Sequence, residues 1–320
     1  MESETAYQKA KAALFGGALE DALVYIDLAL EQHPQTAVYL HTKGQILRFG
    51  DRFTDSLLYL TEAITIDQSQ TDYWVSRGEV YCQLDQFEKG LMDFEEALNL
   101  APENVDAHYF RACALEDLGK VEEALVSFGR AIELCPDEVL APLHRGNLFF
   151  KVGQLEEALE SYEHALRIDP HNEDALAGAG MVHYRCWDYA EALQYFEKVL
   201  QVVPESAYDY YLHGNTLVKL EQLEASLPSF DKALQYRPDF REALLNRGDV
   251  YTQLGQLELA LQDFDQLVLQ HPDYADGHFN RGAVLSQLGR DQHAYLAYRR
   301  TLEINPNDRE AQERMNRLAP

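Results

Sequence analysis

Residues 71–104 read TDYWVSRGEVYCQLDQFEKGLMDFEEALNLAPEN, and this stretch decides the fold. A small residue, Gly78, lies in its first half; a second, Gly90, precedes the bulky Phe94 by four residues, and Pro102 follows at the end. Two antiparallel helices approach closely only where a small residue faces its neighbour. The stretch therefore predicts two helices joined by a short turn, the second stopped by proline.

The same pattern recurs along the chain with a period of 34 residues. Prolines lie at residues 34, 102, 136, 170, 204, 238, 272 and 306, and Gln68 stands at the middle of the one double gap. This period is typical of stacked helix–turn–helix repeats. It divides the chain into nine repeats and a closing helix, which span 3–36, 37–70, 71–104, 105–138, 139–172, 173–206, 207–240, 241–274, 275–308 and 309–320.

Three positions of the repeat carry the packing signal. Position 8 is Gly or Ala in every repeat, position 20 is always small, and position 24 is always bulky. Positions 17, 20, 21, 24, 27 and 28 share one face of the second helix, as in an amphipathic helix. We therefore expect positions 8 and 20 to meet where the two helices pack.

The repeat at 71–104 places Trp74, Gly78, Tyr81, Gly90, Phe94, Ala97 and Pro102 as tetratricopeptide repeats do. Over nearly its whole length the chain resembles the tetratricopeptide repeat family. The resemblance implies an all-α fold: a right-handed α-solenoid (superhelix) whose first helices line the concave side, forming a single domain over residues 1–320. The first repeat is thin, with three alanines on its first helix, and we expect that end to fray or to pack against something.

Charge and composition limit the class of partner. The chain has 54 Asp and Glu against 27 Lys and Arg, a formal charge of −27. This charge repels phosphate backbones and anionic membrane surfaces, so no nucleic-acid partner is expected. No run of 18 apolar residues and no signal-peptide pattern occurs in the sequence. The sequence therefore predicts a cytoplasmic protein without membrane insertion.

No motif of catalysis or cofactor binding occurs in the sequence: there is no glycine-rich phosphate loop, HExxH or GxSxG. His183 and Cys186 lie one helical turn apart, but a third and fourth metal ligand are not evident. We therefore expect no enzyme activity, no cofactor and no metal. Cys82 and Cys113 lie on successive first helices; a regulatory disulfide stays open there, although free thiols are favoured.

Positions 2, 5, 6, 9, 12 and 13 of each first helix are expected to form the inner face. This face is acidic in repeats three and four, then aromatic, then rich in amides. Tyr, Phe and Met are favoured anchors at protein interfaces, and Asn can pair with a peptide backbone. The predicted peptide-binding residues are Tyr109, Phe110, Asn147, Phe150, Met181, Tyr184, Tyr208, Tyr211, Asn215, Asn246 and Asn280.

Each feature of the inner face also has a structural explanation. The rings could pack across the groove, the asparagines could have no ligand role, and the acidic stretch could serve solvation. Arginines recur at position 7, and we interpret them as structural. Some members of the family clamp the terminal carboxylates of chaperones with Lys or Arg at position 5. That position holds no basic residue here, so this activity is not expected.

The leading hypothesis is a non-catalytic scaffold, adaptor or chaperone-like assembly factor. It would bind an extended or helical segment with basic and apolar side chains in the concave groove. One alternative is self-assembly through the terminal repeats, suggested by the small-residue face of the first repeat and by the stripe of Ala311, Met315 and Leu318 in the closing helix. Another is a substrate-recruiting arm of a larger enzyme, such as a glycosyltransferase.

Overall fold

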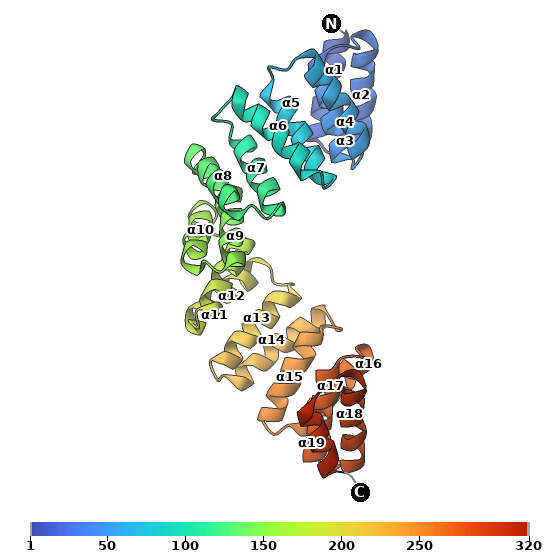
Figure 1. Cartoon of the computed structure of the whole chain (residues 1–320), viewed down its shortest axis with the longest axis vertical. Helices are drawn as coiled ribbons and strands as arrows, with labels where there is room; N and C mark the ends of the chain where they lie inside the picture. The colour runs from blue at the N-terminus through green and yellow to red at the C-terminus, as the bar shows by residue number, and fades with distance from the viewer. Residues whose placement is uncertain (1, 319–320) are drawn as a thin grey trace. The chain divides into compact units, whose positions relative to one another are not determined.

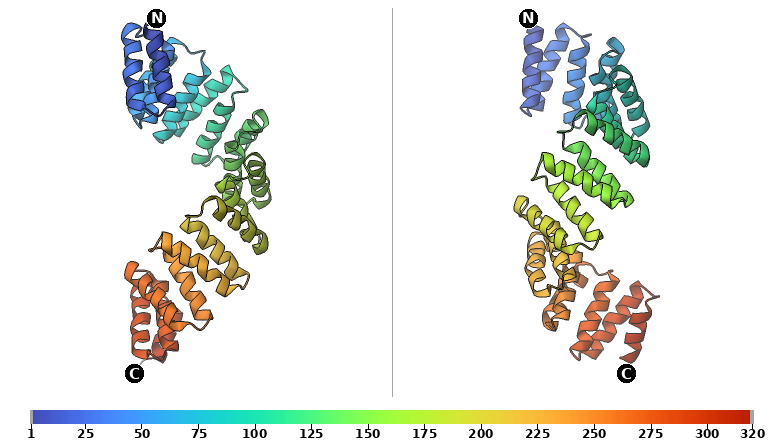
Figure 2. Two further views of the ribbon diagram at one scale, coloured as in Figure 1. Left: turned by 180° about the vertical axis from the view of Figure 1, so that it is seen from behind. Right: turned by 90° about the vertical axis from the view of Figure 1, so that its left-hand side faces the viewer.

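The computed structural model describes residues 2–318 and consists of α-helices joined by short turns (Figures 1 and 2). No strand occurs within these residues, so the all-α prediction is confirmed. The helices divide into two compact units, Met1–Ile168 and Asp169–Pro320, which are described separately.

The described residues of the first unit form five helix pairs, one for each of the first five repeats. Its first helices are α1 (Glu2–Phe15), α3 (Ala37–Phe49), α5 (Thr71–Gln83), α7 (Val105–Asp117) and α9 (Leu140–Val152). Its second helices are α2 (Leu19–Gln32), α4 (Phe53–Ile66), α6 (Phe87–Leu100), α8 (Val121–Leu134) and α10 (Leu155–Ile168).

The second unit contains four helix pairs and one further helix within the described residues. Its first helices are α11 (Glu173–Arg185), α13 (Ala207–Lys219), α15 (Arg241–Gln253) and α17 (Ala275–Gln287). Its second helices are α12 (Tyr189–Val202), α14 (Leu223–Tyr236), α16 (Leu257–Gln270) and α18 (Asp291–Ile304), and α19 (Arg309–Arg317) follows them. The helix pairs therefore fall where the 34-residue period places them.

The two helices of a repeat meet where position 8 faces the bulky side chain at position 24. A Cβ added to Gly78 would lie only 2.5 Å from Cε1 of Phe94, whose side chain is completely buried. In the eighth repeat, a Cβ on Gly248 would lie 2.7 Å from Cε1 of Phe264. Glycine at position 8 thus leaves the space that the ring fills.

Positions 8 and 20 also meet, as expected. In the second repeat the Ser56 hydroxyl donates a 2.7 Å hydrogen bond to the Gly44 carbonyl oxygen. In the third repeat a Cβ on Gly90 would lie 3.0 Å from the Gly78 carbonyl oxygen. A small residue at position 20 therefore brings the second helix against the backbone of the first.

Four of the five arginines at position 7 bind position 23 of the same repeat, and Arg281 binds Asp265 of the preceding repeat, which agrees with the structural interpretation. Arg77 forms two hydrogen bonds to the Asp93 carboxylate, at 2.8 and 2.7 Å, and Arg247 binds Asp263 in the same way, at 2.9 and 2.6 Å. Both aspartates are buried, and this burial raises the pKa of each carboxyl although the arginine opposes it. Such two-pronged pairs fix the helices of a repeat relative to each other.

Both ends of the chain use their small and apolar residues for packing within the chain. At the first end, Ala6 and Ala10 are buried, and the Tyr7 ring lies 4.9 Å from the ring of Tyr39, so this end packs. At the other end Ala311 is buried, and Met315 and Leu318 pack on the core of the second unit. The stripe therefore contributes to packing within the chain, and self-assembly through the terminal repeats stays a prediction. 

The contact between positions 8 and 24 predicts opposite effects of two glycine substitutions. Gly78→Ala should lower the free energy of unfolding by about 1–3 kcal/mol, because the added methyl group meets a buried ring. Gly129→Ala in α8 should be neutral or raise it by up to about 1 kcal/mol, because no atom lies within 4 Å of its added Cβ and alanine favours helix. Chemical denaturation of both variants tests this; equal effects would contradict the contact.

Candidate functional site

The predicted site residues converge best in the second unit, on the face formed by its first helices. A hollow of about 310 Å³ opens there over three helices, α11, α13 and α15. It is lined by Tyr184, Tyr211, Asn215, Val218, Lys219, Asn246, Asp249, Val250 and Gln253. Four of these nine residues are predicted peptide-binding residues.

Helical spacing explains why these side chains share one hollow. Tyr211, Asn215, Val218 and Lys219 follow one another by four, three and one residues and so lie on one face of α13. The face of α15 starts at Asn246 and is built with the same helical spacing. The Tyr211 ring also touches the core, with its centroid 4.9 Å from that of Phe240 and 6.5 Å from that of Phe230. The floor of the hollow is thus anchored in the core.

Amide side chains connect neighbouring first helices at this face. The Asn246 Nδ2 donates a 2.6 Å hydrogen bond to Oδ1 of Asn215, and the Asn280 Nδ2 donates a 3.0 Å bond to Oδ1 of Asp249. Both bonds run from position 6 of one repeat to position 9 of the repeat before it. Each amide has two donor hydrogens and an acceptor oxygen, so the Asn215–Asn246 bond leaves capacity on both side chains.

Asp249 and Lys219 are the charged residues of the hollow, and Asp249 is its one acid within the described residues. Burial, with a smaller contribution from repulsion by Asp276, raises the pKa of the Asp249 carboxyl to about 6. Within the described residues, the Asp249 carboxylate accepts a hydrogen bond from Asn280 and forms no ion pair. Sequence reasoning places Asp249 on the inner face but does not single it out. The sequence feature that could have singled out Asp249 is an acid at position 9, where the fifth and seventh repeats have Asn.

Two further predicted residues of the second unit lie outside this hollow. Tyr208 is 48% exposed and lines a second hollow of about 260 Å³, together with Glu173, Asp174, Ala177, Val199, Val203, Ser206 and Asp209. Burial raises the pKa of Asp209, and Asp174 adds to this effect. Met181 is partly buried on α11. Their role in binding stays a prediction.

The predicted residues of the first unit are largely engaged in packing. The Tyr109 ring centroid lies 5.2 Å from Phe110, 6.0 Å from Phe128 and 5.6 Å from His144. Both Tyr109 and Phe110 pack on the core, as the structural explanation of the rings proposes. Phe150 is partly buried.

The amide of the first unit and the acidic stretch also have partners within the chain. Asn147 accepts a 2.8 Å hydrogen bond from the Tyr162 hydroxyl of its own repeat. Glu79 pairs with Arg48 at 2.5 Å, and burial raises the pKa of Glu79 to about 6. Lys151 lies 3.4 Å from the Glu116 carboxylate. These contacts make the first unit a weaker candidate for binding than the hollow of the second.

Within residues 2–318, the cysteines considered above form no disulfide, and the histidine considered above packs against an aromatic ring. Cys82 and Cys113 are free, and burial raises the pKa of each thiol to about 12, which keeps both in the less reactive protonated form. The His183 ring stacks on Tyr195, with centroids 5.4 Å apart. No group of three or more potential metal ligands occurs among the described residues.

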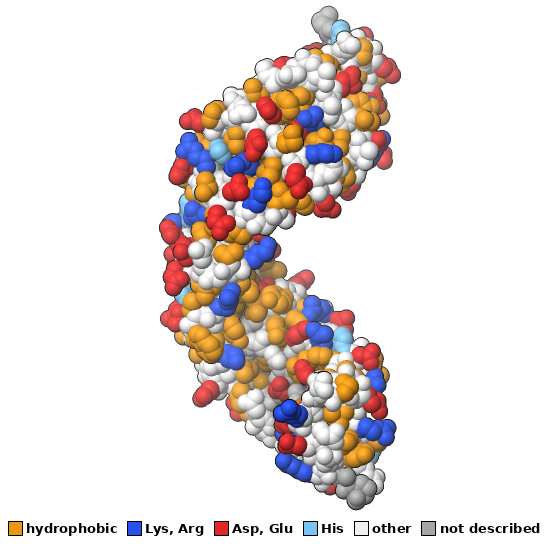
Figure 3. Space-filling model, in the orientation of Figure 1, with side chains coloured by type: hydrophobic (Ala, Val, Ile, Leu, Met, Phe, Trp, Pro, Cys, Tyr) orange, Lys and Arg blue, Asp and Glu red, His pale blue; other side chains and the backbone are white. Residues whose placement is uncertain are grey.

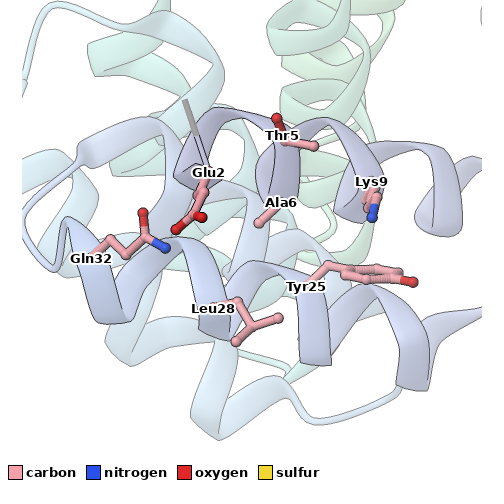
Figure 4. Close-up of a pocket in the computed structure, with 7 residues that line it drawn as sticks. All are labelled: Glu2, Thr5, Ala6, Lys9, Tyr25, Leu28 and Gln32. Carbon is pink, nitrogen blue, oxygen red and sulfur yellow. The ribbon is translucent and has the colours of Figure 1, made fainter.

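Another hollow, of about 350 Å³, lies between α1 and α2 (Figure 4). Its lining includes Thr5 and Ala6, at positions 3 and 4 of the first repeat. In the second repeat the same positions, Tyr39 and Leu40, are buried against the first repeat. The hollow is therefore the helix-packing face of the first repeat. Elsewhere on the visible surface, acidic and basic side chains are interspersed with apolar ones (Figure 3).

Family models of tetratricopeptide repeats match most of the chain. The model described as TPR repeat matches residues 146–185 and 248–289, and models described as tetratricopeptide repeat match 71–104, 105–138, 174–203, 211–268 and 275–308. No curated protein matches the chain. Within residues 2–318, no helix has the length and apolar character needed to cross a membrane.

Solved structures agree with the fold. The structure of YrrB, titled a TPR protein with an unusual peptide-binding site, is 31% identical, has a TM-score of 0.52, and covers 58% of this chain and 96% of its own. The C-terminal part of a TPR repeat-containing protein from Cytophaga hutchinsonii is 18% identical with a TM-score of 0.66, covering 77% of this chain and 99% of its own.

The Cut9–Hcn1 hetero-tetramer of APC/C provides a third comparison. It is 19% identical, with a TM-score of 0.53, and covers 94% of this chain and 59% of its own. At this identity the likeness shows the fold alone. The repeat-model matches, the helix pairs and the contact between positions 8 and 24 together show that the chain belongs to the tetratricopeptide repeat family, whose repeats are scaffolds for protein interaction.

Proposed function

We propose that this chain is a non-catalytic scaffold that holds an extended segment of a partner protein in the hollow between α11, α13 and α15. The observation that carries the proposal is the Asn215–Asn246 pair beside Asp249, an acid that forms no ion pair within the described residues although Lys219 lines the same hollow. An adaptor or assembly factor would use the site in this way, by binding without chemistry.

The asparagine pair supports recognition of main chain. An extended peptide presents N–H and C=O groups in alternation, and these need partners once water is displaced. The remaining donor capacity of Asn215 and acceptor capacity of Asn246 match one N–H and one C=O group. Because the two amides already bind each other, little side-chain entropy is lost when they meet the peptide.

Asp249 supports recognition of a basic side chain. A partly buried carboxylate without a cation is unfavourable in the free protein, as the raised pKa of Asp249 reflects. A Lys or Arg side chain in the hollow would supply the missing charge and hydrogen bonds. The formal charge of −27 would also steer a basic segment toward the chain.

The rings of Tyr184 and Tyr211 support apolar contacts on either side of the main chain. Tyrosine has an apolar face and a polar end, so it contributes area at a site that is wet before binding. The printed description of YrrB as having a peptide-binding site fits a peptide ligand, because that protein is 31% identical over 58% of this chain. 

A selection experiment tests the asparagine pair. Random peptides displayed on phage are selected against the full chain, and the enriched peptides are synthesised for affinity measurement by fluorescence anisotropy. Asn246→Ala should weaken binding at least about fivefold, or about 1 kcal/mol, because it removes the main-chain partner. Asn99→Ala, at an exposed position of α6, is the control and should bind as the wild type does. Failure to enrich any peptide, or equal affinity of both variants, would refute the proposed function.

Asp249→Asn should raise stability while weakening binding of basic peptides. The folded-state pKa of about 6 exceeds the ordinary value of 3.8, so the charged carboxylate destabilises the fold above pH 6. We expect the variant to be more stable at pH 7 by an amount of the order of 2 kcal/mol. The difference should shrink toward pH 4, where the wild-type carboxyl is protonated.

Thermal melts at several pH values measure this effect, with Asp239→Asn at an exposed position as control. Asparagine keeps the oxygen that accepts the bond from Asn280. A variant that is less stable at pH 7, or that binds basic peptides as tightly as the wild type, would contradict the role given to Asp249.

A further inference from the structure

Trp187 occupies an unusual place in the turn between α11 and α12. It adopts a positive φ of 69°, and it is 77% exposed. It stands at position 15 of the sixth repeat, where five other repeats have glycine with φ between 72° and 85°. The remaining three have acidic residues, Asp51, Asp85 and Glu221. A bulky aromatic residue at this position is therefore particular to the sixth repeat.

Folding of the repeat does not explain this tryptophan. A residue with a Cβ in the left-handed region costs about 1–2 kcal/mol relative to glycine. The indole also leaves most of its apolar surface in water. Its aromatic neighbour is Tyr189, with ring centroids 6.2 Å apart in an edge arrangement. A costly, exposed aromatic side chain of this kind is typical of binding anchors.

The surface of Trp187 continues into the hollow described above. The Tyr189 ring lies 5.2 Å from that of Tyr184, and Tyr184 lines the hollow together with Tyr211. These four aromatic residues lie within the second unit, on α11, α12, α13 and the turn between the first two. A segment that leaves the hollow past Tyr184 therefore meets Tyr189 and then Trp187.

We infer that Trp187 is a second anchor for the same partner segment, and that it holds a Lys or Arg side chain against the face of its indole. This inference rests on the proposed function. Indole is the best aromatic acceptor for a cation, and a neighbouring acid adds to the attraction of the cation. Asp188, the next residue, has a carboxylate 3.8 Å from Nδ1 of His183, but its side chain is 58% exposed and can bind the same cation. The bound segment thus carries one base at Asp249 and another at Trp187.

Tryptophan fluorescence gives a direct test, because the chain has two tryptophans, Trp74 and Trp187. In a Trp74→Phe background, Trp187 is the sole source of indole emission. Titration with an enriched peptide should change the intensity or position of this emission, with the same midpoint as the anisotropy of the labelled peptide. Binding seen by anisotropy without any change in emission would overturn the inference and leave the proposed function standing.

A matched pair of variants separates binding from folding. Trp187→Gly should weaken peptide binding at least about fivefold without lowering the melting temperature, because glycine suits the positive φ. Glu221→Gly makes the same backbone change at position 15 of the next repeat, where φ is 60°, and should leave affinity unchanged. Unchanged affinity of Trp187→Gly, or a lowered melting temperature that accounts for its weaker binding, would overturn the anchor role.

The charge of the anchored side chain is tested on the peptide. Each Lys or Arg is replaced by Gln in turn, and the affinity of each peptide is measured for the wild type and for Trp187→Gly. One replacement should weaken binding to the wild type but have little further effect on the variant, as expected for coupled groups. If the coupled residue is a proline or an aliphatic residue instead, the cation is excluded as the occupant. If Asn246→Ala has no effect while Trp187→Gly does, the proposed hollow fails independently of the anchor.

Discussion

The contact between a small residue at position 8 and a bulky one at position 24 governs the rest of the structure. Because a Cβ at Gly78 or Gly248 would collide with a buried phenylalanine, the helices of these repeats can pack at this distance only with glycine there. The ring then fills the space between the two helices of its own repeat. Arginine–carboxylate pairs such as Arg77–Asp93 fix the same two helices from the side. The opposite side of each first helix is not needed for this contact and can carry polar residues.

Because this side of the first helices is not constrained by the helix pair, it can carry the polar side chains that line the hollow in the second unit. Positions 6 and 9 lie outside the contact between the paired helices, so they can join one repeat to the next through side chains, as Asn246 does with Asn215. The joined amides are held in place by the stack and keep unused hydrogen-bonding capacity. Asp249 differs from these amides, because no ion pair offsets its burial and the pKa of its carboxyl is therefore raised. A group that lowers stability in the free protein is best understood through what it binds.

The period and the packing positions could be predicted from the sequence because every repeat obeys the same steric requirement. The same contact therefore leaves the same residue pattern in all nine repeats. The site could be predicted only in part. Tyr211, Asn215 and Asn246 have the register of inner-face residues, and they share a hollow. Tyr109 has the same register, but its ring packs against Phe128 and His144, which depends on neighbours that differ between repeats. The stripe of Ala311, Met315 and Leu318 has a similar ambiguity, because an apolar stripe in the sequence does not reveal how much of it packs on its own chain.

The same limit applies to Trp187 and Asp249, whose importance depends on exposure and on missing partners and not on residue type. Periodicity makes Trp187 a local departure from a glycine position; only its 77% exposure and its link through Tyr189 to Tyr184 relate it to the hollow. The most direct test of the account is a crystal structure of the chain with an enriched basic peptide. The account predicts an extended main chain bonded to Asn215 and Asn246, with a basic side chain at Asp249. A peptide bound on the second helices, or bound on the first helices without contact to either asparagine, would contradict it.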